Sequence, residues 1–270
     1  MVKNLMFSML TMGGIAFCQE NTFSPAIEDN SFFIEEAYNQ EKGVIQHISN
    51  GILTPGSSGE FFYAFTEEWP LWGVDHQISF TVPCTLSRLP GESGIGDILI
   101  NYRYQLFGRD DWASIAPRFS FSLPAGDVGK GLSSGRIGYQ LNVPASKRVS
   151  NAFVIHANLG MAVMPSAIGY TASGAQIDHT LFTYSAGLSA VALLTEEFNI
   201  MCEYLYSSAQ TLDQAGNVVH TGQLLVSPGV RFAINVSDLQ IVPGLGIPFT
   251  WANNEVTTGL FFYLSFEHPI

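Results

Sequence analysis

The stretch "GDILINYRYQLF", residues 96–107, decides the fold. Its apolar and polar side chains alternate, so that Ile100 and Tyr102 share one face while Asn101 and Arg103 share the other. Successive side chains of a β-strand point to opposite faces. A charged side chain in mid-strand, opposite an apolar face, is typical of a membrane barrel with a polar lumen and a lipid-facing exterior.

The same alternation recurs along the chain from Gly43 onward. The candidate strands are near 43–53, 60–67, 74–86, 95–107, 113–124, 135–145, 151–164, 180–194, 198–209, 219–234, 239–251 and 257–268. Strands of a soluble β-sandwich alternate as well. About twelve strands, an even number, instead match a single antiparallel transmembrane β-barrel of the bacterial type.

The linkers between these segments alternate in length, which also favours a barrel. The short linkers are "GRDD", "SKRVS", "TEE" and "NVSD", and the long ones, rich in Gly and Ser, are "SRLPGESG", "AGDVGKGLSSG", "PSAIGYTASGAQIDH" and "TLDQAGN". Membrane barrels have short periplasmic turns and longer outer loops. The linkers therefore predict which end of the barrel faces the periplasm.

Composition excludes several classes of function. Hydrophobic residues make up 47% of the chain and charged residues only 13%, where soluble domains carry about 25%. The net charge of −12 argues against nucleic-acid binding, because phosphates need Lys and Arg. No Cys or His cluster has the spacing of metal ligands, so no metal or other cofactor is expected.

The N-terminus predicts export. Residues 1–18 read as a cleaved signal peptide, with Lys3 before a short apolar run and the small residues Ala16 and Cys18 near its end. Lipidation of Cys18 is the alternative. Residues 19–42 are acidic and polar and are expected to be a periplasmic lead-in, followed by the barrel over 43–270. This organisation predicts an outer-membrane protein of a diderm bacterium, with lipid and the barrel-assembly machinery as partners.

Strand parity predicts which charged residues face the lumen. They are Asp97, Arg103, Arg118, Glu203 and Arg231. Isolated buried charges are costly, so these groups are expected to pair with one another or to contact water. The three arginines would then set a field that selects a small-molecule solute, as rings of charged side chains do in pores. Alternatively, the charges pair and fill the barrel.

The first strand contains a possible catalytic pattern, "GVIQHISNG" at 43–51. It resembles the active-site strand of outer-membrane phospholipase A, His-x-Ser-Asn-Gly, which here maps onto His47, Ser49, Asn50 and Gly51. A serine nucleophile needs a base and a group that orients the base. The match covers one strand, and no orienting Asn or calcium-binding segment follows. The alternative is a polar strand of the lumen without chemistry.

A second resemblance extends over the mature chain. The segments "NSFFIEEAYNQEKGVIQHIS" (30–49), "GDILINYRYQL" (96–106) and "PRFSFSLPAGD" (117–127) resemble the outer-membrane protein family named for the meta-pathway of phenol degradation. The matching residues are Glu35, Glu36, Tyr38, Asn39, Gln40, Glu41, Gln46, His47, Gly96, Asp97 and Tyr104. The resemblance implies a signal peptide, a membrane barrel and a role in moving small, often hydrophobic compounds. It also makes "QHI" an ordinary feature of the opening strand.

Three hypotheses for function follow. The chain is a channel or transporter for small compounds, hydrophobic or aromatic ones among them, and not an enzyme. Alternatively, it is a phospholipase-like hydrolase that uses His47 and Ser49. As a third alternative, it is a plugged structural or adhesive barrel whose function lies in outer loops such as 165–180.

Overall fold

The computed structural model describes residues 31–56, 59–89 and 91–269 of the chain. The predicted signal peptide, 1–18, and residues 19–30 lie outside this range. Among the described residues, no helix is long and apolar enough to cross a bilayer.

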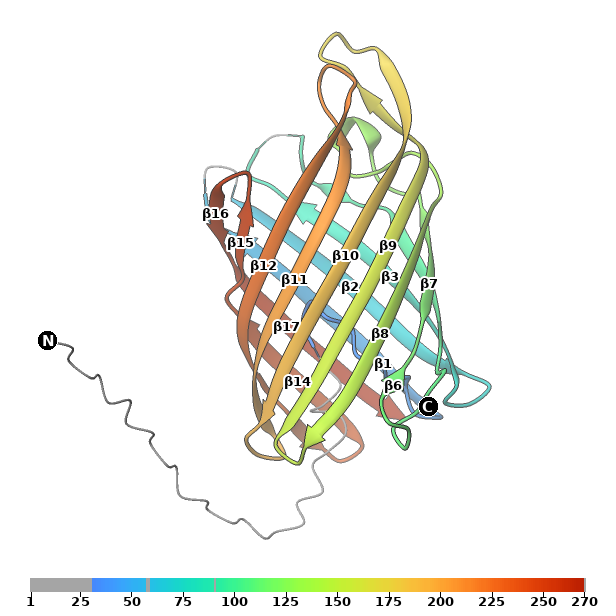
Figure 1. The fold of residues 1–270 in the computed structure, drawn as a ribbon, viewed down its shortest axis with the longest axis vertical. Helices are drawn as coiled ribbons and strands as arrows, with labels where there is room; N and C mark the ends of the chain where they lie inside the picture. The colour runs from blue at the N-terminus through green and yellow to red at the C-terminus, as the bar shows by residue number, and fades with distance from the viewer. Residues whose placement is uncertain (1–30, 57–58, 90, 270) are drawn as a thin grey trace, which may run out of the picture.

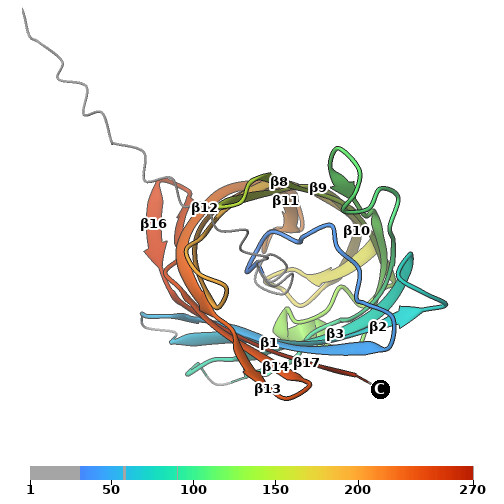
Figure 2. The ribbon, with the colours of Figure 1, turned by 90° about the horizontal axis from the view of Figure 1, so that it is seen from below.

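The described chain forms a closed antiparallel barrel of 12 strands (Figures 1 and 2). Five barrel strands consist of two aligned pieces, so the labels run to β17. The strands are β1 (Val44–Thr54), β2 (Glu60–Leu71), β3 (His76–Leu86), β4 (Gly94–Ile95) with β5 (Ile98–Tyr104), β6 (Ser114–Ile115) with β7 (Arg118–Leu123), β8 (Gly138–Ser150), β9 (Phe153–Tyr170), β10 (Gln176–Leu193), β11 (Phe198–Leu212), β12 (Val218–Phe232) with β13 (Ile234–Val236), β14 (Leu239–Gly246) with β15 (Phe249–Ala252), and β16 (Glu255–Thr258) with β17 (Leu260–Pro269). The barrel closes because β1 pairs with both β2 and β17.

The predicted strands are confirmed, but two of them are longer than expected. The range 165–179, predicted as an outer loop, is mostly strand, because β9 and β10 continue to pair up to Tyr170 opposite Gln176. The Gly and Ser residues of this range predicted a loop. Pairing between the two arms instead satisfies their backbone groups, and the hairpin extends past the neighbouring strands (Figure 1).

The two ends of the barrel differ. Short connections at 72–75, 151–152, 194–197 and 237–238 lie at one end, which we call the turn end, together with the C-terminus (Figure 1). The longer connection 105–113 also lies at the turn end. The opposite loop end carries most of the other long connections, the tight turn 253–254 and the short 3-10 helix η1 (Val128–Lys130).

The two faces of the barrel wall also differ, as the alternation predicted. On β5, Tyr102 is 42% exposed on the outer face, whereas Arg103 is 2% exposed on the inner face. The inner face is itself divided. Buried polar side chains line it all round, and only the part formed by β9 to β17 also carries an apolar cluster, which includes Val191, Met201 and Phe261.

The structure differs from the sequence expectation for the chain before β1. Residues 31–40, here called the lumen segment, lie inside the ring of strands instead of outside it on the periplasmic side (Figure 2). The physical reason is that Phe32 and Ile34 are buried against the wall, and the acidic Glu35 finds arginine partners there.

Candidate functional site: the lumen and its N-terminal segment

The backbone of the lumen segment is held by side chains of the barrel. The carboxylate of Glu203, on β11, accepts the backbone N–H groups of Phe32 at 3.1 Å, Phe33 at 3.2 Å and Ile34 at 3.1 Å. Buried backbone N–H groups need acceptors. Because the segment is not paired with a strand, a wall carboxylate supplies the acceptor.

Two side-chain amides each hold the segment in both directions. The amide of Asn158 accepts the N–H of Glu35 at 2.8 Å and donates to the carbonyl of the same residue at 2.6 Å. Gln105 donates to the carbonyl of Ala37 at 2.8 Å and accepts the N–H of Asn39 at 3.0 Å. An amide side chain carries both donors and an acceptor, so it can replace a strand neighbour.

The aromatic ring of Phe32 anchors the N-terminal end of the lumen segment. A β-carbon at Gly229 would lie 2.5 Å from the Phe32 ring, and one at Gly244 would lie 2.7 Å from it. The ring also contacts Phe261 and Tyr263, with centroid distances of 4.8 and 5.7 Å. Glycine at these inner positions of β12 and β14 therefore provides the socket that Phe32 fills.

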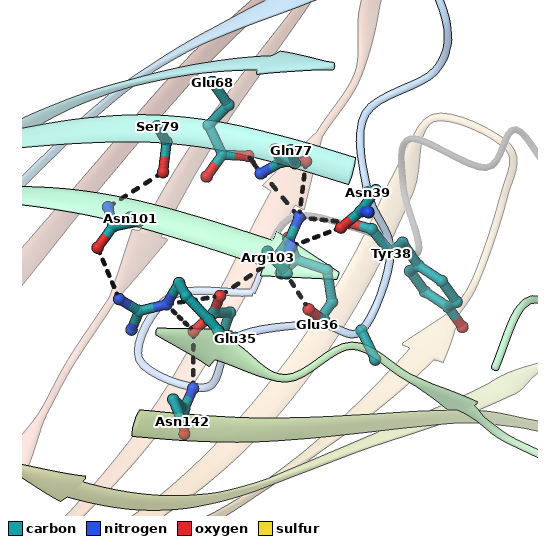
Figure 3. Close-up of polar contacts among 12 residues, drawn as sticks. Glu35, Glu36, Tyr38, Asn39, Glu68, Gln77, Ser79, Asn101, Arg103 and Asn142 are labelled. Carbon is teal, nitrogen blue, oxygen red and sulfur yellow. Dashed lines mark hydrogen bonds and ion pairs between the residues drawn. The ribbon is translucent and has the colours of Figure 1, made fainter. Parts of the chain in front are cut away.

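A charge cluster holds the middle of the segment. The Glu35 carboxylate accepts from Nε of Arg118 at 2.9 and 3.0 Å, from Nη1 of Arg103 at 3.2 Å and from Nδ2 of Asn142 at 2.7 Å (Figure 3). Burial raises the pKa of Glu35, but Arg118 and Arg103 outweigh burial and hold this pKa below its usual range. Glu35 is therefore the anion of the cluster.

Strand register explains why the two arginines are together. Arg103 on β5 is directly opposite Arg118 on β7, and Arg118 is directly opposite Asn142 on β8. Like charges at directly opposite positions repel each other. Glu35 offsets this repulsion, and Glu68 on β2 approaches Arg103 at 3.9 Å from the other side.

The predicted lumen residues occupy different places. Arg103 and Arg118 share the Glu35 cluster, whereas Glu203 holds the segment backbone. Arg231 is buried and donates from Nε to Asn199 at 3.2 Å. Asp97 lies apart at the loop end, just before β5.

The carboxylate of Asp97 organises a loop. It accepts the backbone N–H of Ser134 at 3.0 Å and that of Gly126 at 3.3 Å. Three of the five charged residues, Arg103, Arg118 and Glu203, thus contact the lumen segment, and Asp97 contacts a loop. Sequence reasoning missed Glu35, Asn142 and Asn158 as parts of the lumen site.

His47 and Ser49 share one face of β1, as predicted, but it is the outer face. Their neighbours Ile48 and Asn50 line a lumen cavity, so alternation directs His47 and Ser49 outward. The Ser49 hydroxyl lies 3.0 Å from the Tyr63 hydroxyl. His47 lies 3.1 Å from His268 through Nε2 and 3.5 Å from Glu67 through Nδ1. The histidine ring nitrogens are thus directed to other side chains.

Within the described residues, two lumen cavities meet at the charge cluster. One, of about 250 Å³, lies beside β1, β2, β3 and β5. The other, of about 370 Å³, lies beside β8 to β11. Phe33, Glu35 and Arg118 line both cavities. The described part of the chain holds no group of three or more His, Cys, Asp or Glu side chains that could bind a metal.

Comparison with solved structures supports the fold. No family model matches the chain, and no curated protein matches it either. An outer-membrane channel from Pseudomonas putida F1 matches 89% of this chain and 100% of its own, with a TM-score of 0.66 and 10% identity. The NanC porin matches 83% of this chain and 100% of its own, with a TM-score of 0.51 and 8% identity. Membership of the phenol meta-pathway family stays a prediction.

Proposed function

We propose that this chain is an outer-membrane channel for small, partly hydrophobic solutes, and that the lumen segment narrows the channel in the present state. One observation carries the proposal: two cavities large enough for small molecules meet at Arg118, inside a closed barrel. The solved channel and porin with the same fold support it.

The outer face of the barrel and its two ends support a place in an outer membrane and an orientation within it. The outer face presents apolar and aromatic side chains such as Tyr102 and Phe121, each more than a third exposed, to the surrounding medium. Such a band suits lipid, and short turns suit the periplasmic side. The turn end then faces the periplasm, and the loop end, with the β9–β10 hairpin, faces outward.

The way in which the lumen segment is held supports an open state. Side chains, and not a strand ladder, bind its backbone, so it can leave without unpairing the barrel. The wall behind it on β3 to β8 carries Gln77, Asn101 and Ser120, which water can solvate. A lumen wall of this kind remains compatible with passage of solute after the segment moves.

The experiment is single-channel recording in planar bilayers. The refolded mature protein is compared with a variant in which residues 31–40 are replaced by a Gly-Ser linker of equal length. We expect conductance steps that grow in the linker variant. Arg118→Ala should change ion selectivity, because it removes a lumen charge, while Arg136→Ala, on an exposed loop, should not.

The alternatives predict other outcomes. A folded linker variant that stays silent would refute the channel and favour the structural barrel, with the β9–β10 hairpin as its outer feature. Fatty-acid release from lipid vesicles that Ser49→Ala abolishes would favour the hydrolase.

A further inference from the structure

The barrel wall alone contains an anion site. Its row of residues across β5, β7 and β8 places the positive charges of Arg103 and Arg118 next to each other and the amide of Asn142 beside them. Glu68 on β2 lies 3.9 Å from Arg103, but the carboxylate that both arginines share comes from Glu35, which belongs to the lumen segment and not to a strand. From the standpoint of the barrel, Glu35 is a tethered ligand.

We propose that Arg118, Arg103 and Asn142 bind the carboxylate of a small solute with an apolar body, and that Glu35 occupies this site when the solute is absent. The proposal rests on the proposed channel function and names its solute class. A solute carboxylate that displaces Glu35 also removes the central attachment of the lumen segment.

The donors converge as carboxylate recognition requires. Nε of Arg118 is within 3.0 Å of both Glu35 oxygens, and Nδ2 of Asn142 is 2.7 Å from one of them. The Arg118 guanidinium is held in place because its Nη1 donates to Asn101 at 2.8 Å. Charge-assisted bonds from an oriented guanidinium are among the strongest available to a carboxylate.

A solute can reach these donors. The side chain of Arg118 is 20% exposed, compared with 3% for Arg103, and Arg118 lines both cavities. Arg118 is therefore the first contact, and Arg103 provides charge from behind it.

The cavity beside the site indicates the body of the solute. The cavity of about 370 Å³ is lined by the apolar Phe33, Met164 and Leu205, with hydroxyls of Thr183 and Ser185 among them. Small-ligand sites typically combine apolar walls with a few polar groups that fix orientation. A small aromatic carboxylate fits this combination: its ring lies against the apolar side chains and its carboxylate on Arg118.

Binding would shift the segment between two states. A solute that binds only where Glu35 has left favours the released state by its differential affinity. Conversely, Glu35 lowers the apparent affinity for the solute, because the two carboxylates compete for the same donors. Removing the Glu35 charge should therefore strengthen solute binding.

The test is isothermal titration calorimetry of the detergent-solubilised barrel with benzoate, and with benzamide as its neutral counterpart. We expect benzoate to bind, Glu35→Gln to bind it about tenfold more tightly, and benzamide to give no binding. The factor corresponds to one charge-assisted bond. Arg118→Gln should weaken benzoate binding at least tenfold, while Arg136→Gln should leave it unchanged.

Two further arms keep the result decisive. If Arg118→Gln does not fold, as judged by heat-dependent gel mobility, Asn142→Ala replaces it and should weaken binding severalfold. Equal binding of benzoate and benzamide, or unchanged affinity in Glu35→Gln, would overturn the carboxylate site even in a conducting channel. Arg118-dependent benzoate binding by a barrel that never conducts would support the site and refute the channel.

Discussion

Replacing Phe32 by Ala should release the N-terminal end of the lumen segment from the barrel wall. The Phe32 side chain is 8% exposed and fills a socket formed by inward-facing glycines, in contact with Phe261 and Tyr263. The substitution removes this ring but leaves the backbone bonds to Glu203 in place. It therefore isolates the contribution of the socket.

The magnitude follows from the rigidity of the socket. Truncation of a buried Phe to Ala costs about 3–5 kcal/mol, and the cost is larger where the surroundings cannot collapse into the cavity. Here the socket wall is the paired backbone of β12 and β14, with Gly229 opposite Gly246, which cannot close in. We therefore expect at least about 3 kcal/mol, which raises the equilibrium for local release more than 100-fold.

Hydrogen exchange read by mass spectrometry in detergent micelles measures this equilibrium, because exchange of the bonded N–H groups requires local opening. Peptides covering 31–40 should exchange at least 100-fold faster in Phe32→Ala, while strand peptides keep their rates. Phe262→Ala is the matched control, since Phe262 is 41% exposed on the outer face. Rates for 31–40 within threefold of the unmodified protein would refute the socket.

Three more predictions follow from the same contacts. Gly229→Ala places a β-carbon 2.5 Å from the Phe32 ring, so the single variant should accelerate hydrogen exchange of residues 31–40. Combined with Phe32→Ala it should add little, because residues in contact are not additive in a double-mutant cycle. Strict additivity of the two effects would contradict this contact. Glu203→Gln removes the charge that binds three backbone N–H groups of the lumen segment. It should weaken binding of the segment to the wall by about 1.5–3 kcal/mol, which single-channel recording would show as more frequent openings. An unchanged opening frequency would argue against this role of Glu203. Ser49→Ala loses one hydrogen bond to Tyr63, about 1 kcal/mol, so denaturant unfolding should change little, and fatty-acid release from vesicles should be equal in both proteins; a serine-dependent release would restore the hydrolase hypothesis.

The strands could be predicted from the sequence because their environment imposes a period of two. On β5, Tyr102 and Arg103 must face different media, and this difference is present in their side chains alone. The same rule placed Arg118, Glu203 and Arg231 on the inner face, where the structure has them. Parity determines the face of a residue without reference to any distant contact.

The lumen segment could not be predicted in this way, because its partners are distant in sequence. Glu35 and Asn158 are separated by 123 positions, and Phe32 and Glu203 by 171. Its acidic composition resembles that of an exposed leader. A usable signal was present in the wall: Gly187, a residue type depleted in strands, falls at an inner position, where a β-carbon would collide with the Ile34 side chain. Glycine inside a strand marks close approach of another chain segment.

Strand parity could not predict which charges pair. It gives the face of the wall on which a residue lies, but not the position of that residue along the barrel axis. Register places Arg103 opposite Arg118, so neither can neutralise the other, and Asp97 lies at the loop end with Ser134. A counter-ion within the same sheet row would have neutralised the arginines permanently. Glu68 on β2 lies 3.9 Å from Arg103, but the carboxylate that Arg103 and Arg118 share comes from the lumen segment, through Glu35, so this shared charge can be exchanged without altering the barrel. The repulsion between the two arginines is then what makes the row receptive to another carboxylate whenever Glu35 leaves.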